Sequence, residues 1–200
     1  MEKWWLMLLL LASALDRESQ RFAFIAEQGW DSSCGFGALA CLMCRYWGKP
    51  ADETSLALEF FPERIVSGDL TVSFADMSAI LKAKGFACAG YRLDYAQLGA
   101  ALKTYSPILI HFSLPDGHFA LALAQDGEWI IVSDPAEGTT VFSKEDFLSR
   151  WSGKALVAAI PSQKANLALL EEAVSAARAR ITLLERIAAR LPGRISGGTR

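Results

Sequence analysis

The chain has 200 residues, 52% of them hydrophobic, which is enough for one domain with its own core that needs neither disulfides nor a metal to fold. Twenty basic and 22 acidic residues are mixed along the chain and give a formal net charge of -2. This balance offers no basic surface to nucleic acid, so we exclude a nucleic-acid-binding role.

The first residues follow the pattern of a secretion signal. Lys3 precedes an apolar run over residues 4–14, and the small residues at its end resemble a cleavage site. About 11 apolar residues are too few to span a bilayer, which needs about 20. We therefore expect a signal peptide over residues 1–14 and a periplasmic chain from Leu15, close to the inner membrane if the signal is kept as an anchor. A buried core helix is the alternative reading.

The next pattern predicts a helix over residues 34–47. Apolar residues recur there at helical spacing, and Gly48 ends the pattern. Ser32 and Ser33 are candidate N-caps of this helix. Cys34 then lies in the first turn, where unpaired backbone N–H groups and the helix dipole favour an anion such as a thiolate.

Beyond this helix, further helices come first and strands follow. Helical spacing predicts helices over residues 52–60, 73–84 and 94–104, with a strand over 86–91 before the last of them. From Pro107 the period is that of strands joined by Gly and Pro turns, over residues 107–114, 118–125 and 128–134. The remaining pattern predicts an edge strand over 139–142, a helix from the Ser143–Asp146 capping box to Trp151, and a buried strand over 155–160. This order indicates an α+β domain over residues 15–161, with N-terminal helices packed on an antiparallel sheet.

The last part of the chain has a heptad pattern. Apolar residues alternate in steps of three and four at Leu167, Leu170, Val174, Ala177, Ile181, Leu184, Ala188 and Leu191. We expect an amphipathic helix over residues 162–191, about 43 Å long for a 163–191 helix. This helix either pairs with a partner, which would be a second copy or a secretion-system protein, or folds back along the domain. Residues 192–200 are expected to form a disordered tail.

Four cysteines allow other chemistries. Cys41 and Cys44 match the Cys-x-x-Cys of thiol oxidoreductases, but such motifs need the first cysteine at a helix start, and Cys41 lies two turns in. The spacing of Cys34, Cys41, Cys44 and the histidines fits no usual zinc site. Cys41 and Cys88 are expected to be small core residues. We expect neither a metal nor a cofactor.

A possible site depends on the hairpin that carries His118 and Asp134. If residues 125–127 form a three-residue loop, counting outward places His118 directly opposite Asp134. The small alanines on the same face would then let the Cys34 helix approach closely. A two-residue loop would shift the register by one and put the two side chains on opposite faces.

A thiol at a helix start, an imidazole and a carboxylate are what a cysteine hydrolase needs. Cys34 would attack a peptide carbonyl, and His118 would pair with the thiolate and then protonate the leaving amine. Asp134 would orient the imidazole. The backbone N–H of Cys34 and the side-chain amide of Gln28 would stabilise the oxyanion. Each residue alone has a structural explanation, but the combination favours catalysis.

The same residues resemble a known family. Gln28-x5-Cys34-Gly35, Gly117-His118-Phe119, Asp134-Pro135 and Phe147-x3-Trp151-x-Gly153 are similar to the motifs of the C39 family of papain-like cysteine peptidases, over roughly residues 22–161. The resemblance implies a papain-like fold, cleavage of leader peptides after a Gly-Gly pair, and the four roles given above. A stand-alone, exported domain with a helical tail resembles the accessory peptidases of functional-amyloid secretion systems.

Two residues depart from the family pattern. Ser33 replaces an Asp that often precedes the cysteine, and Phe36 replaces a small residue or Pro, so we expect both to alter the wall of the cleft. Two alternatives stay open: a domain that binds leader peptides without cutting them, and a secretion scaffold that acts through the 163–191 helix.

Overall fold

The computed structural model describes residues 20–161 and 163–190. The signal peptide expected over residues 1–14 and the tail expected over 192–200 lie outside these ranges. Within them, no helix combines the length and the apolar character that a membrane crossing requires.

In the described part of the chain, one antiparallel sheet forms the centre, with six strands in the order β1-β6-β2-β3-β4-β5. The strands are β1 (Ala87–Arg92), β2 (Ile108–Phe112), β3 (His118–Asp126), β4 (Trp129–Asp134), β5 (Gly138–Ser143) and β6 (Trp151–Ala159). This arrangement confirms the expected α+β class. The strand expected over residues 155–160 begins earlier, at Trp151, and lies between β1 and β2.

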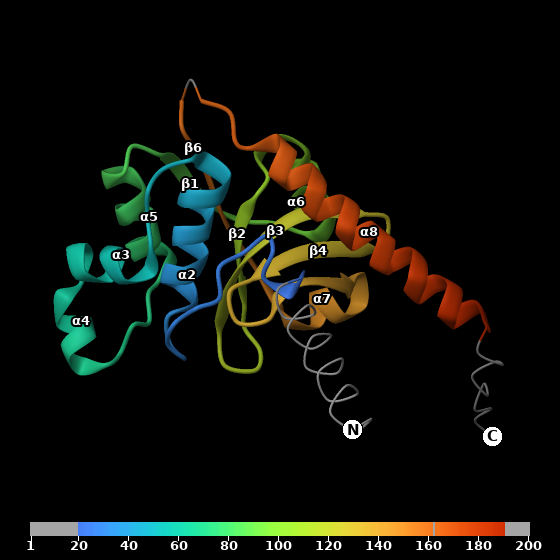
Figure 1. The fold of residues 1–200 in the computed structure, drawn as a ribbon, viewed down its shortest axis with the longest axis horizontal. Helices are drawn as coiled ribbons and strands as arrows, with labels where there is room; N and C mark the ends of the chain where they lie inside the picture. The colour runs from blue at the N-terminus through green and yellow to red at the C-terminus, as the bar shows by residue number, and fades with distance from the viewer. Residues whose placement is uncertain (1–19, 162, 191–200) are drawn as a thin grey trace, which may run out of the picture.

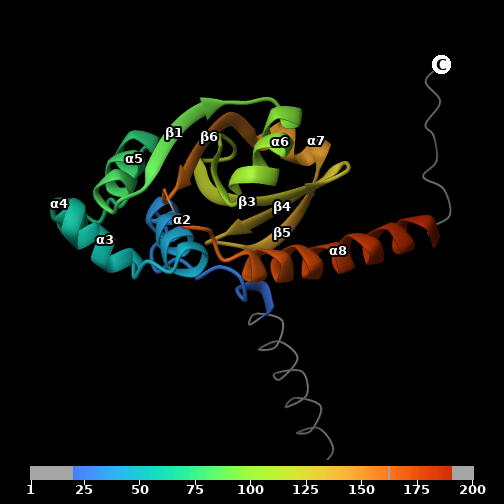
Figure 2. The same cartoon turned by 90° about the horizontal axis from the view of Figure 1, so that it is seen from above.

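Helices cover both faces of the sheet. One face packs against a cluster that includes α2 (Cys34–Cys41), the π-helix η1 (Leu42–Tyr46), α3 (Glu53–Phe60) and α5 (Phe74–Ala83). The other face packs against α6 (Tyr95–Tyr105) and α7 (Lys144–Arg150). Figures 1 and 2 show this layering, with α2 and α8 on one side of the sheet and α6 and α7 on the other.

The helix starts follow the local sequence. Ser73 and Asp76 form a capping box at the start of α5, and Asp94 and Gln97 form one at the start of α6. The short helix α4 (Pro62–Ser67) was not predicted. It has no buried residue and therefore leaves no hydrophobic period in the sequence.

The C-terminal helix α8 (Leu167–Arg190) folds back on the domain along its first half. It begins later than expected, where Asn166 Oδ1 accepts the N–H of Leu169 at 3.2 Å. Ala177 and Ile181, in the middle of the heptad pattern, are buried, and so is Ala173, which lies one residue before the predicted position Val174. The C-terminal part of α8 extends past the sheet (Figure 2), although Trp129 Nε1 at the start of β4 still donates to Glu185 Oε1 at 3.3 Å. Apolar side chains of this part are exposed at Leu183, Leu184 and Ile187.

Candidate active site

The loop between β3 and β4 differs from the prediction. Asp126 pairs with Trp129, so the loop has two residues instead of three, and the predicted register is wrong. A two-residue loop by itself would place His118 and Asp134 on opposite faces. A β-bulge at Leu123 shifts the register once more and returns the two residues to the same face.

The bulge makes His118 a diagonal neighbour of Asp134. Leu121 pairs with Ser133, so the next position of the ladder brings Ala120 opposite Asp134. His118 lies two residues further along β3, a diagonal separation that a long side chain can bridge. The imidazole does so, and His118 Nε2 lies 2.7 Å from Asp134 Oδ1.

The Asp134 carboxylate is held in place by its own turn. Besides His118, Oδ1 accepts the backbone N–H of Ala136 at 2.8 Å and of Glu137 at 3.2 Å. The side chain is only 6% exposed. The carboxylate is therefore buried, oriented by the backbone and aimed at one nitrogen of the imidazole.

Cys34 is the first residue of α2, as predicted, and lies near the start of β3, where it lines one cleft with Gly117 and Phe119. The Cys34 side chain is close enough to the imidazole to raise the pKa of His118. Ser33 occupies the N-cap position but does not cap with its side chain. Its Oγ instead donates to the carbonyl of Trp30 at 2.7 Å, which ties the preceding loop to the helix start.

The close approach of α2 to the site depends on glycines in the helix. A Cβ on Gly37 would lie 3.1 Å from Pro135, next to Asp134, and a Cβ on Gly35 would lie 3.4 Å from the Phe119 ring. The alanines of β3 do not serve this purpose, contrary to the prediction. Ala120 and Ala122 belong to the cluster on the opposite face, with α6.

The charge state of His118 follows from its neighbours. Burial alone lowers the pKa of the imidazole, but the hydrogen bonds and negative charges of Asp134 and Cys34 outweigh burial and raise it to about 10. The raised pKa keeps the His118 imidazole protonated at neutral pH, and a protonated imidazole beside a cysteine favours the thiolate form of a thiol in general. Because Nε2 faces Asp134, the other ring nitrogen, Nδ1, is left for Cys34.

Gln28 lies beside the site, with its amide turned toward the loop. Its backbone N–H donates to Pro135 O at 2.8 Å, which fixes it next to the Asp134 turn. Nε2 donates to Trp30 O at 2.9 Å and more weakly to Asp31 O at 3.4 Å, while Oε1 is buried without a hydrogen-bond partner. The second bond, at 3.4 Å, is longer than the usual range for N–H···O hydrogen bonds. The role of Gln28 as oxyanion donor stays a prediction.

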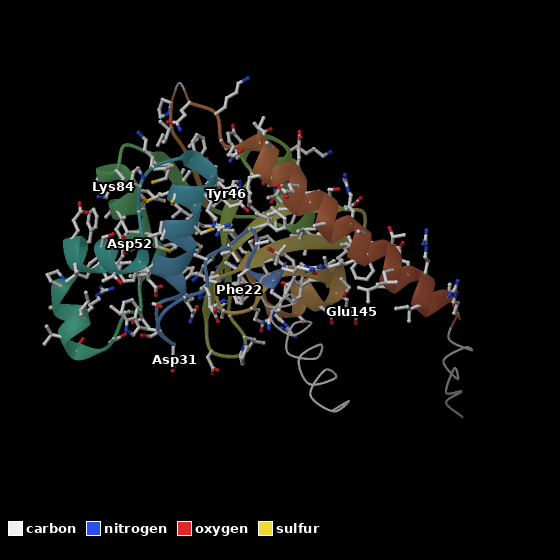
Figure 3. All side chains as sticks on the ribbon, viewed as in Figure 1. Phe22, Asp31, Tyr46, Asp52, Lys84 and Glu145 are labelled. Carbon is white, nitrogen blue, oxygen red and sulfur yellow. The ribbon has the colours of Figure 1, made fainter. Side chains whose placement is uncertain are left out.

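A cleft of about 470 Å³ opens beside Cys34. One wall is formed by residues 71–75, which are the end of the loop before α5 and the first two residues of that helix. The side that belongs to the sheet includes His111, Phe119 and Lys154. His111 pairs with Phe119 across β2 and β3. In Figure 3, the labelled Asp31 marks the loop that leads into α2 at this end of the molecule.

The two departures from the family pattern do not reach the cleft, contrary to expectation. Ser33 and Phe36 are both fully buried, and neither lines the cleft. Phe36 packs edge-on against Phe61 with ring centroids 6.2 Å apart. Both residues therefore support the helix start from within the core.

The remaining cysteines have structural surroundings. All four cysteines are free. Burial raises the pKa of the Cys41 thiol to about 12, which is opposite to what a redox nucleophile needs, while Cys44 is exposed. Cys88 is half-buried and contacts Ser78 Oγ at 3.2 Å. In the part of the chain that the structure describes, no three His, Cys, Asp or Glu side chains gather as a metal site would require.

Comparison with known families agrees with this geometry. The sequence model of the peptidase C39 family matches residues 23–163, so the chain belongs to the peptidase C39 family. The resemblance first drawn from the motifs is thereby confirmed.

Two curated relatives come from pseudomonads. The probable functional amyloid protease FapD of Pseudomonas aeruginosa is 31% identical over 138 residues, which cover 67% of this chain and 59% of the relative. The FapD of Pseudomonas fluorescens is 27% identical over 146 residues, with the same two coverages. The chain thus spans less than two thirds of the length of these relatives.

Solved structures confirm the fold. The peptidase domain of Streptococcus ComA, a bifunctional ABC transporter of a quorum-sensing pathway, has a TM-score of 0.57 at 21% identity, covering 68% of this chain and 97% of that domain. A double glycine motif protease from an AMS/PCAT transporter, solved in complex with a leader peptide, has a TM-score of 0.56 at 22% identity, covering 67% and 89%.

Proposed function

We propose that this chain is a cysteine endopeptidase that cuts leader or secreted polypeptides in a secretion pathway. The observation that carries the proposal is an imidazole that is bonded to a buried carboxylate and has a cysteine at a helix start as its neighbour. His118 Nε2 lies 2.7 Å from the buried Asp134 carboxylate, and Cys34, at the start of α2, is close enough to raise the pKa of the same imidazole. That arrangement is suited to nucleophilic attack by a thiolate.

The reaction has two steps. The Cys34 thiolate attacks the scissile carbonyl carbon, and the negative charge moves to the carbonyl oxygen, near the backbone N–H of Cys34 and the amide of Gln28. The His118 imidazolium then gives its proton to the leaving nitrogen, and the C–N bond breaks to leave a thioester. In the second step His118 takes a proton from water, which attacks the thioester and releases the acid product with the Cys34 thiolate.

The relatives suggest the class of substrate. Two of them are named as functional amyloid proteases, and one structural neighbour is named as a double glycine motif protease with its leader peptide. We propose cleavage after a Gly-Gly pair, in the periplasm, in the service of amyloid or bacteriocin secretion. Localisation rests on the signal pattern of residues 1–14 alone.

The test is cleavage of synthetic leader peptides that contain Gly-Gly, monitored by mass spectrometry. The wild-type protein and Cys44→Ala, whose cysteine is exposed outside the cleft, should cut, and Cys34→Ala should not. Equal cleavage by wild type and Cys34→Ala would refute the peptidase proposal. Binding of the peptide by both proteins with no cleavage by either would favour the leader-binding alternative.

A scaffold role has one specific observation in its favour. The distal part of α8 exposes Leu183, Leu184 and Ile187 on a helix that continues past the sheet. Such a stripe is suited to a second helix. If it mediates self-association, the wild-type protein should sediment as a dimer and Leu184→Glu with Ile187→Glu as a monomer. A monomeric wild-type protein would contradict self-association.

A further inference from the structure

The side chains that the sheet contributes to the Cys34 cleft are aromatic near Cys34, and the one two strands away is a lysine. Phe119 on β3 has its ring 5.0 Å from that of Phe74 and 4.9 Å from that of His111, which lies on β2. Lys154, on the next strand β6, also lines the cleft. The row therefore runs from a ring beside the helix start to a cation two strands away.

A bulge in β6 directs Lys154 into this row. Ile110 of β2 pairs with Ala155 of β6, and Phe112 pairs with Trp151. Between these two pairs, the single residue His111 lies opposite three residues of β6, at positions 152–154. Gly153 has a backbone φ of 74°, a conformation that residues with a side chain rarely adopt. Bulges beside active sites commonly re-aim a side chain.

Lys154 also stands opposite another cation. Arg92 on the edge strand β1 pairs directly with Lys154, so both side chains leave the same face of the sheet. Like charges in this position destabilise a sheet. Within residues 20–161 and 163–190, no carboxylate lies within ion-pairing distance of either, and no Asp or Glu lines the cleft. An anionic ligand would relieve this repulsion.

The direction of the substrate follows from the proposed chemistry. His118 protonates the leaving amine, so the peptide after the scissile bond departs past His118, where a separate cavity includes Asp134. The peptide before the bond then occupies the Cys34 cleft. Two strand spacings of about 4.8 Å separate β3 from β6, and an extended peptide advances about 3.3 Å per residue, so Lys154 lies about three residues from the cut.

We propose that Lys154, with Arg92 beside it, is a specificity determinant that binds an acidic side chain about three or four residues before the scissile bond. This inference rests on the proposed peptidase function for its direction. It names a feature of the substrate, a carboxylate at a set distance from the cut, that the catalytic residues do not require.

The experiment compares fluorogenic Gly-Gly peptides that differ only in Glu, Gln or Lys at the third and fourth positions before the cut. Wild type should prefer Glu over Gln by about fivefold in kcat/KM, as expected for one partly exposed ion pair. The preference should appear in KM and weaken in about 1 M salt. Lys154→Gln should abolish it, and Lys154→Glu should reverse it toward the Lys peptide. Lys103→Glu, an exposed lysine of α6, is the control for net charge and should behave as wild type.

The outcomes separate the two proposals. Equal cleavage of the Glu and Gln peptides by wild type, or a Glu preference that survives Lys154→Glu, overturns the role of Lys154 and leaves the peptidase proposal intact. If wild type cuts none of the peptides, the peptidase proposal fails. Fluorescence anisotropy of the same peptides on Cys34→Ala then tests the carboxylate site, which requires tighter binding of the Glu peptide and loss of that difference in Lys154→Gln.

Discussion

Replacing Asp134 by Asn isolates the charge of this residue from its structural role. The Asn Oδ1 can still accept the backbone N–H groups of Ala136 and Glu137, which the carboxylate accepts at 2.8 and 3.2 Å. It can also still meet His118. The variant therefore removes the negative charge next to the imidazole and leaves the turn in place.

The size of the effect follows from the bond that loses its charge. A hydrogen bond to a charged group contributes about 1.5–3 kcal/mol, so we expect kcat/KM to fall by about 10- to 150-fold. Loss of the anion also disfavours the imidazolium. The pKa of His118, held at about 10 in the wild type, should fall, and the decline of activity on the alkaline side should move to lower pH.

The assay is the pH profile of kcat/KM on a cleaved peptide, together with urea denaturation. Asp134→Asn should unfold within about 1 kcal/mol of wild type, whereas Asp134→Ala, which loses the acceptor of both backbone N–H groups, should be less stable by about 1–2 kcal/mol. An Asn variant within about threefold of wild-type kcat/KM, with an unmoved alkaline limb, would refute the electrostatic reasoning.

Three further predictions test the nucleophile, the helix approach and the C-terminal helix. Iodoacetamide at about pH 6 should modify Cys34 at least about tenfold faster than the exposed Cys44, because an ordinary thiol is then under about 1% thiolate. Equal rates of modification by mass spectrometry would contradict a thiolate paired with the His118 imidazolium. Gly35→Ala should lower the free energy of unfolding by about 1–3 kcal/mol, since the new Cβ would lie 2.2 Å from Val72. A variant as stable as wild type in urea would contradict this, because it would show that Val72 can move aside at no cost in stability. Ala177→Asp should place an unpaired charge against the sheet and release α8, so that limited proteolysis removes the helix while peptide cleavage persists; a helix that stays protected would argue against the docking.

Much of the site could be predicted because it depends on local pattern. The start of α2 at Cys34 follows from the helical spacing after the Ser33 position, and the period of two in β3 and β4 places His118 and Asp134 near the same end of a hairpin. These features are set by hydrogen bonds between residues close in the chain.

The register of the hairpin could not be predicted in the same way. The loop has two residues, and the bulge at Leu123 compensates for it, so the two errors cancel at His118 and Asp134. A bulge leaves no period of its own in the sequence, because it is chosen by how the strand packs on both of its faces. The prediction that His118 and Asp134 share a face was therefore right, whereas the residue opposite Asp134 and the helix that covers this face were wrong.

By itself, the sequence determined most of the element types, with α4 the exception, the order of thiol, imidazole and carboxylate, and the family to which they belong. The tertiary structure alone decided how α2 reaches the imidazole, through Gly35 and Gly37, that α8 docks by its first half, and that Lys154 enters the cleft. The physical reason is distance along the chain. Backbone hydrogen bonding and side-chain period act over a few residues, whereas these contacts join segments that only the packing of the whole domain brings together.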